Sequence, residues 1–209
     1  ALLPGTDERP LAVVTDADRI SFNQLESDRW NEIAAASNLG QLNLASITQL
    51  DDGSIWFGTD QAAYHQTEDR IERYSVPSPQ AFSRDSQGTI WAAANTELRR
   101  LDGDRFIKHS EVEALTRTVS QALLASPDHE LWVGTQFFGA FRHDAAGWHR
   151  YDTKDGLSDN NVIALARLEN GHIIAATQRG YCRFDGSTWS PYLQGLPSAR
   201  TTGLNTTGD

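Results

Sequence analysis

Amide and carboxylate side chains recur just after short apolar runs in this chain, and at one such place they adjoin two adjacent phenylalanines. A planar amide or carboxylate can form paired hydrogen bonds with hydroxyl or peptide groups, and an aromatic ring adds apolar contact, so the set suits a sugar or a peptide. The ordinary alternative is that these positions are polar because loops face water. The candidate ligand-binding residues are Asp16, Asp18, Asn43, Asp60, Gln61, Asn95, Gln136, Phe137, Phe138, Asn161, Gln178, Arg179 and Arg200.

The histidines and turn carboxylates do not have the spacing of a metal site. The six histidines are His65, His109, His129, His143, His149 and His172, and none belongs to a His-x-x-x-His motif with a companion carboxylate. The carboxylates Asp51, Asp52, Asp85, Asp128 and Glu169 stand in separate turns, unlike the dense ligand loop of a calcium site. We expect these carboxylates to cap turns, the histidines not to converge, and no metal or other cofactor to be bound.

Local catalytic motifs are also missing from the sequence. It contains no Gly-rich phosphate loop, no Gly-x-Ser-x-Gly elbow and no nucleophile–base pair at local spacing. We therefore predict no catalytic residue and favour a protein that is not an enzyme. A catalytic group assembled from distant segments would leave no such motif, so an enzyme stays an alternative.

The elements that position these residues are repeats with a period of about forty. The clearest copies are Ile55–Thr59, Ile90–Ala94, Leu131–Thr135 and Ile173–Thr177, with a fainter one at Leu11–Thr15. A turn and another apolar run precede each copy, and two further runs follow it. Short β-branched and aromatic runs separated by turn residues predict a four-stranded antiparallel meander.

Meanders of this period bury both faces by stacking radially, so the sequence predicts an all-β, five-bladed propeller. Trp56, Trp91, Trp132 and Ile174 occupy the second position of their copies, where we expect them to fill the space between blades. The loops that join second to third strands and fourth to first strands then share the face around the central channel. Those loops carry the candidate residues.

The repeat resembles a known family. The best copy runs from Glu130 to Leu157 and combines Leu131-Trp132-Val133-Gly134-Thr135 with a later Asp155-Gly156-Leu157 loop. This pattern is similar to the two-component regulator propeller repeat, which builds periplasmic sensor regions of bacterial hybrid histidine kinases. The resemblance implies a ligand-binding sensor propeller in the periplasm or outside the cell. Departures from the pattern are Ile174 and Ala12 in place of Trp, and Ala93-Ala94 in place of Gly-Thr.

The two chain ends suggest how the ring closes. We expect blades at about 1–40 with 200–209, 41–77, 78–116, 117–157 and 158–199, so that the run around Leu204 becomes the first strand of the N-terminal blade. The competing interpretation makes Leu2–Leu3 that strand and lets the C-terminal run begin a sixth blade, although Pro4-Gly5 disfavours a strand there. A closed ring should be monomeric. A further alternative is that the chain is a fragment of a larger propeller. The sequence has no methionine, which indicates a processed or excised piece.

Composition narrows the classes of partner. The 209 residues carry 18 Lys+Arg against 28 Asp+Glu, and the net charge of −10 disfavours nucleic acid and anionic membrane surfaces. No apolar run approaches the ~20 residues of a membrane span, so we expect no membrane insertion. Cys182 is the single cysteine; it lies in an apolar run, and we expect a structural thiol.

Three functions follow, in order of preference. The first is a non-enzymatic, extracytoplasmic sensor-type propeller that binds a small polar ligand or a protein partner at the channel face. The second is a propeller lyase, of the virginiamycin B lyase type, or a glycan-cleaving enzyme, with a metal-assisted His and carboxylate site. The third is a scaffold or an engineered propeller fragment.

Overall fold

The computed structural model describes residues 2–3, 11–16, 19–36, 43–67, 70–109, 115–126 and 130–192. These residues form five four-stranded antiparallel sheets, which confirms the five-bladed propeller. The sheets comprise β1 (Leu2–Leu3), β2 (Leu11–Asp16), β3 (Arg19–Glu26) and β4 (Arg29–Ala36); β5 (Leu44–Gln49), β6 (Ile55–Thr59), β7 (Ala63–Gln66) and β8 (Ile71–Tyr74); β9 (Pro79–Arg84), β10 (Ile90–Ala94), β11 (Glu97–Asp102) and β12 (Arg105–Lys108); β13 (Ser120–Ala125), β14 (Leu131–Thr135), β15 (Ala140–Asp144) and β16 (Gly147–Tyr151); β17 (Val162–Arg167), β18 (Ile173–Thr177), β19 (Gly180–Phe184) and β20 (Trp189–Pro191).

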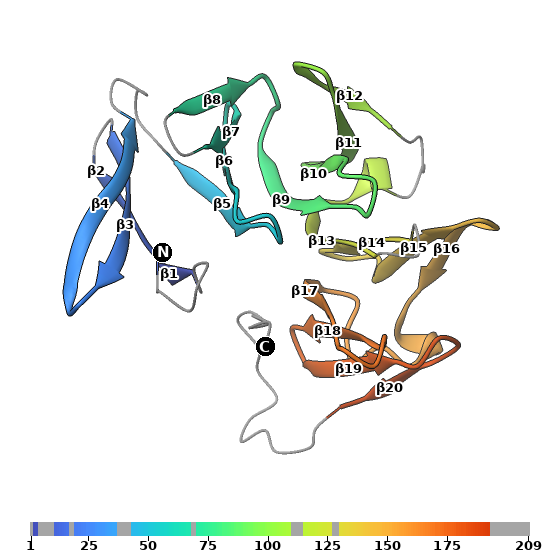
Figure 1. The fold of residues 1–209 in the computed structure, drawn as a ribbon. Coiled ribbons are helices and arrows are strands. Elements are labelled where there is room, and N and C mark those ends of the chain that lie inside the picture. Colours follow the sequence, from blue (N-terminus) through green and yellow to red (C-terminus); the bar gives the residue numbers. More distant parts are fainter. Residues whose placement is uncertain are drawn as a thin grey trace.

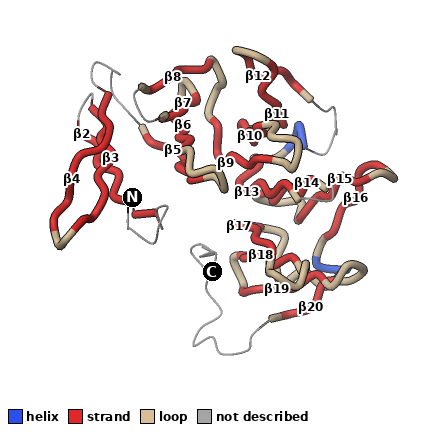
Figure 2. Tube along the Cα trace, in the orientation of Figure 1, coloured by secondary structure: helices blue, strands red, loops and turns tan. Residues whose placement is uncertain are grey.

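The sheets are arranged about a common centre, with the first strands β5, β9, β13 and β17 innermost (Figure 1). Two short 3-10 turns interrupt the strands, η2 (Leu115–Arg117) and η3 (Thr153–Asp155), each just before a first strand (Figure 2). Within the described ranges, no helix is long and apolar enough to cross a membrane.

The second strand is the most deeply buried part of a blade. Every residue of β6, β14 and β18 is buried, because neighbouring strands cover their edges and adjacent sheets cover their faces. The sequence of a strand that is buried on both faces is a continuous apolar run rather than an alternation of apolar and polar residues. This double burial explains why the second-strand motif is the clearest repeat in the sequence.

The turns that precede β6 and β10 are each built by an aspartate and a glycine. Asp52 accepts a hydrogen bond from the backbone N–H of Ser54 at 3.0 Å, and Asp85 accepts one from Gln87 at 3.0 Å. Gly53 and Gly88 have φ of 82° and 82°, a conformation that favours glycine. For Asp52 and Asp85 the prediction of turn capping is confirmed.

The prediction that the repeated tryptophans fill the space between blades is confirmed most clearly for two of them. Trp56 is 1% exposed and packs on Phe82 and Phe106 of the third sheet. Trp132 is fully buried and packs on Phe184 and Trp189 of the fifth.

The N-terminal sheet differs from the expected arrangement at its first strand. Leu2 and Leu3 pair with Ala12 and Leu11, so β1 occupies the place beside β2 that we expected the C-terminal run to take. Residues 193–209 lie outside the described ranges, and ring closure through them stays a prediction. The sheet packs on its neighbour through Phe22, whose ring centroid lies 5.6 Å from that of Phe57.

Candidate functional site

A chain of backbone hydrogen bonds brings the second-to-third and fourth-to-first loops to one face. Its links run from the N–H of Ser78 to Asp60 O at 3.2 Å, from Asn95 to Ser78 O at 3.2 Å, from Ser120 to Asn95 O at 2.9 Å, from Gln136 to Val119 O at 3.0 Å, from Gly139 to Asn160 O at 2.9 Å and from Gln178 to Asn161 O at 3.0 Å. The bonds alternate between links within a blade and links to the next blade. These bonds fix the positions of the loops relative to one another along the propeller axis.

Five of the candidate residues therefore share this face through the backbone links: Asp60, Asn95, Gln136, Asn161 and Gln178. Their neighbours Gln61, Phe137, Phe138 and Arg179 belong to the same turns. Asp16 ends β2, and Asn43 directly precedes β5; both are exposed. Asp18 and Arg200 lie outside the described residues.

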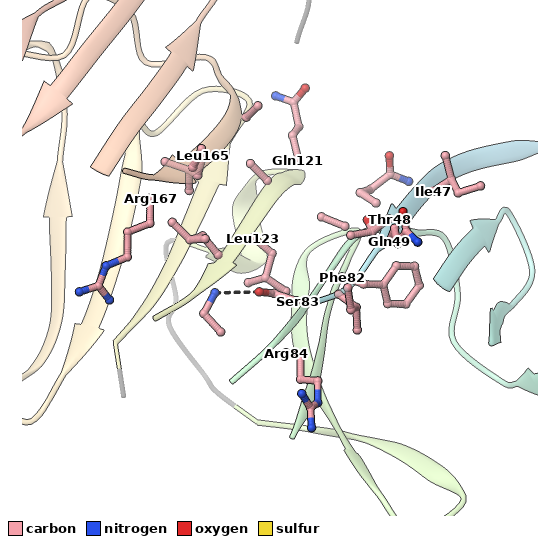
Figure 3. A pocket seen from close by; sticks show the side chains of 18 of the residues that line it. Ile47, Thr48, Gln49, Phe82, Ser83, Arg84, Gln121, Leu123, Leu165 and Arg167 are labelled. Atoms are coloured by element: carbon pink, nitrogen blue, oxygen red, sulfur yellow. Dashed lines mark hydrogen bonds between the residues drawn. The ribbon is translucent and has the colours of Figure 1, made fainter. Parts of the chain in front are cut away.

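Beneath this face a channel of about 690 Å³ runs between the first strands (Figure 3). Its walls come from β5, β9, β13 and β17 together with Leu50 and Asp51. No predicted ligand-binding residue among those described lines the channel itself. The loops surround its mouth, while the strands form its walls.

The channel has two chemically different ends. At the loop face, Gln121 donates through Nε2 to Asn161 Oδ1 at 2.9 Å, and Gln80 lines the wall at the equivalent place in the third sheet. At the opposite end, the guanidinium of Arg84 lies 3.4 Å from Asp51 and 3.4 Å from Asp52. Ile47, Leu123 and Leu165 lie between the two ends (Figure 3).

Sequence reasoning missed Gln80 and Gln121. Both lie inside first strands, two residues before Phe82 and Leu123, whereas the candidate residues were taken from loops only. Each glutamine is the residue skipped at a register shift between the first and second strands, so the regular alternation of side chains along a strand does not place it.

The backbone of the loop after β14 is held by hydrogen bonds on both sides of Phe138. Phe138 donates its N–H to Thr135 Oγ1 at 3.0 Å, and its carbonyl accepts from Arg150 Nε at 2.9 Å. Gly139 has a φ of 81°, and a Cβ there would lie 2.0 Å from Tyr151 O. Phe137 nevertheless remains 64% exposed. An exposed aromatic side chain on a loop fixed by hydrogen bonds is suited to contact a ligand.

The histidines that the structure describes do not line the channel, but one pair of them meets. His109 and His143, from the third and fourth sheets, have ring centroids 6.3 Å apart and perpendicular planes. The expectation that the histidines stay apart is therefore wrong for this pair. Partial burial, His143 and Arg100 lower the pKa of His109. The described residues contain no group of three or more His, Cys, Asp or Glu that could hold a metal ion.

Cys182 is fully buried in the fifth sheet. Burial raises the pKa of its thiol, although Ser158 donates its N–H to Sγ at 2.9 Å. A buried thiol with a raised pKa is the structural cysteine that the sequence predicted.

Comparison with known proteins supports the fold. No family model matches the chain, and no curated protein sequence matches it. A catalytically inactive virginiamycin B lyase from Staphylococcus aureus with quinupristin is 15% identical over 95% of this chain and 71% of its own, with a TM-score of 0.72. The extracellular domain of the one component system BT4673 from B. thetaiotaomicron is 12% identical over 93% of this chain, with a TM-score of 0.58. The gluconolactonase XC5397 from Xanthomonas campestris is 14% identical over 93% of this chain and 73% of its own, with a TM-score of 0.59.

The chain spans only 37% of the length of the BT4673 domain. At these identities the similarity shows a β-propeller fold that is used both by sensor domains and by enzymes.

Proposed function

We propose that this propeller is a non-enzymatic, extracytoplasmic binding domain of the sensor type, with a small polar ligand held at the channel face. The observation that carries the proposal is the Gln121–Asn161 hydrogen bond of 2.9 Å, which joins a channel wall to a surrounding loop. Through this bond the polar surface of the loops extends to the wall of the channel, a cavity whose size is typical of small-molecule sites.

The chemistry of this mouth supports a ligand rich in hydroxyl or amide groups. An Asn or Gln amide has two donors and an acceptor with two lone pairs. Gln80 Nε2 donates to Ser78 and Gln121 Nε2 to Asn161, so the Oε1 acceptors of the two glutamines and the Nδ2 group of Asn161 are the groups suited to bind a sugar or a peptide without a formal charge. Ile47 and Leu165 below them exclude water and offer apolar contact. The extracellular BT4673 domain, which shares the fold, supports a location outside the cytoplasm.

The proposal is tested by calorimetric titration of the purified protein with oligosaccharides and short peptides. We expect at least one compound to bind, and Gln80→Leu and Gln121→Leu to weaken that binding about tenfold each, because an apolar wall leaves the polar group of the ligand unpaired. Arg105→Ala, on the exposed β12 strand, serves as the control. Absence of binding by every compound would contradict the proposal.

A further inference from the structure

Two exposed arginines lie on the same face as Phe137, on a protein whose net charge is −10. Arg150 donates to the carbonyl of Phe138, and the turns that carry Phe137 and Arg179 both bond to Asn160–Asn161. Arg179 is 79% exposed and Arg150 is 41% exposed. The carboxylates that pair with them are far less accessible, at 20% for Asp159 and 23% for Asp152. We call Phe137, Arg150 and Arg179 the Phe137 platform.

The carboxylates of Asp152 and Asp159 are less exposed than their arginine partners because they accept hydrogen bonds from the backbone. Asp152 Oδ1 accepts from the N–H of Lys154 at 2.8 Å, and Asp155 Oδ2 accepts from the N–H of Asp152 at 2.8 Å, which together cap the turn η3. Asp159 Oδ1 accepts from the N–H of Asn161 at 2.8 Å. Each carboxylate thus stabilises the loop that joins the fourth and fifth blades.

The two cations come from other elements, Arg150 from β16 and Arg179 from the turn between β18 and β19. Arg179 contacts Asp159 through Nε at 3.2 Å, which leaves its two terminal nitrogens for a partner. The guanidinium of Arg150 lies over the ring of Phe138, 5.3 Å from its centroid. The two guanidinium groups are therefore more accessible to a partner than the carboxylates that pair with them.

We propose that the Phe137 platform binds an acidic peptide segment of another protein, with an apolar or aromatic side chain of that segment seated on Phe137. Arginine pairs with carboxylates through two parallel hydrogen bonds, and an aromatic residue with adjoining arginines is the composition of interface hot spots. The overall negative charge does not oppose this, because charges beyond about 8–10 Å are screened at physiological salt. The inference goes beyond the proposed function, since it adds a site for a charged protein segment on the same face as the uncharged channel mouth.

The test uses three fluorescein-labelled probes and anisotropy. The first is a short glutamate-rich peptide with one central phenylalanine; the second has glutamine in place of glutamate, and the third has alanine in place of phenylalanine. We expect the first to bind most tightly and to weaken as salt rises. Phe137→Ala should weaken it about tenfold and Arg179→Ala about threefold, as a central aromatic anchor and an exposed ion pair do.

Ile107→Ala and Arg105→Ala, exposed positions on β12, are the matched controls and should leave binding unchanged. Equal binding of the glutamate and glutamine peptides would overturn the acidic preference while the proposed function stands. Binding of oligosaccharides alone would have the same meaning. If neither peptides nor oligosaccharides bind, the proposed function fails together with this inference.

Discussion

The interface between the fourth and fifth blades and the interface between the third and fourth are built from the same motif but packed differently. Trp132 is fully buried, with Tyr151, Phe184 and Trp189 at ring-centroid distances of 5.7, 5.0 and 5.6 Å. Trp91, at the equivalent place, is only partly buried and meets His109 edge to face at 4.5 Å.

The polar partners of the two indoles differ in the same way. Trp132 donates through Nε1 to Glu130 at 3.2 Å, and the guanidinium of Arg142 lies 5.7 Å from its ring centroid. Trp91 donates through Nε1 to Asp85 in its own turn at 2.8 Å. The second-strand tryptophan is thus buried at one interface and only partly buried at the other. The difference comes from the side chains that the third and fourth strands of the two blades place around it.

The largest expected effect is the removal of the buried indole. Trp132→Ala should lower the free energy of unfolding by about 3–5 kcal/mol, because it leaves a large cavity in an aromatic cluster. Trp91→Ala should cost roughly 1–2 kcal/mol, since solvent already reaches that side chain. Chemical denaturation of both variants measures the difference. Equal losses would show that the two interfaces contribute alike.

A second prediction concerns the glycine that follows Trp132 by two positions. A Cβ on Gly134 would lie 2.7 Å from Val162 Cγ1 and 2.9 Å from Ala122 Cβ, so Gly134→Ala should cost about 1–3 kcal/mol by overpacking. The third blade carries Ala93 at this position, and Ala93→Gly should cost only about 0.5–1 kcal/mol. The same denaturation experiment compares them. A neutral Gly134→Ala would mean that the first strand of the fifth blade can shift.

The smallest effect should be the pH dependence of stability that arises at the interface between the third and fourth blades. The pKa of His109 lies below its usual 6.5 in the folded protein, chiefly through burial and then through His143 and Arg100. As pH falls below about 6.5 the unfolded chain binds the proton first, so stability decreases until the pH reaches the folded-state pKa. Solvent screening keeps this loss below about 1 kcal/mol.

Thermal melts between about pH 7 and pH 5 should therefore show a shallower decrease for His109→Gln than for the unsubstituted protein. His149→Gln, at a side chain that is 45% exposed, is the control for the loss of a histidine. If the decrease of thermal stability with pH were the same in His109→Gln as in the unsubstituted protein, the His109–His143 contact would not contribute to acid sensitivity.

Much of the fold was predictable because its strongest signals are local. The second strands β6 and β14 are buried on all sides and so repeat as Ile55–Thr59 and Leu131–Thr135. The turns before β6 and β10 carry aspartate and glycine for geometric reasons. The candidate face was predictable to the level of loops, since strand order alone decides which loops lie together. Gln80 and Gln121 were not found, because a channel-facing polar residue in an inner strand differs from its neighbours only through the ring geometry.

Sequence by itself determined the repeat, the number of blades, the turn caps and the loops that share a face, since each depends on residues near one another in the chain. Tertiary structure decided which tryptophan is core, which first strand pairs with β2, and that Phe137 stands exposed beside outward-facing arginines. Those features depend on contacts between residues from different blades and between the chain end and the first blade. Such contacts arise only when the sheets are brought together around the channel.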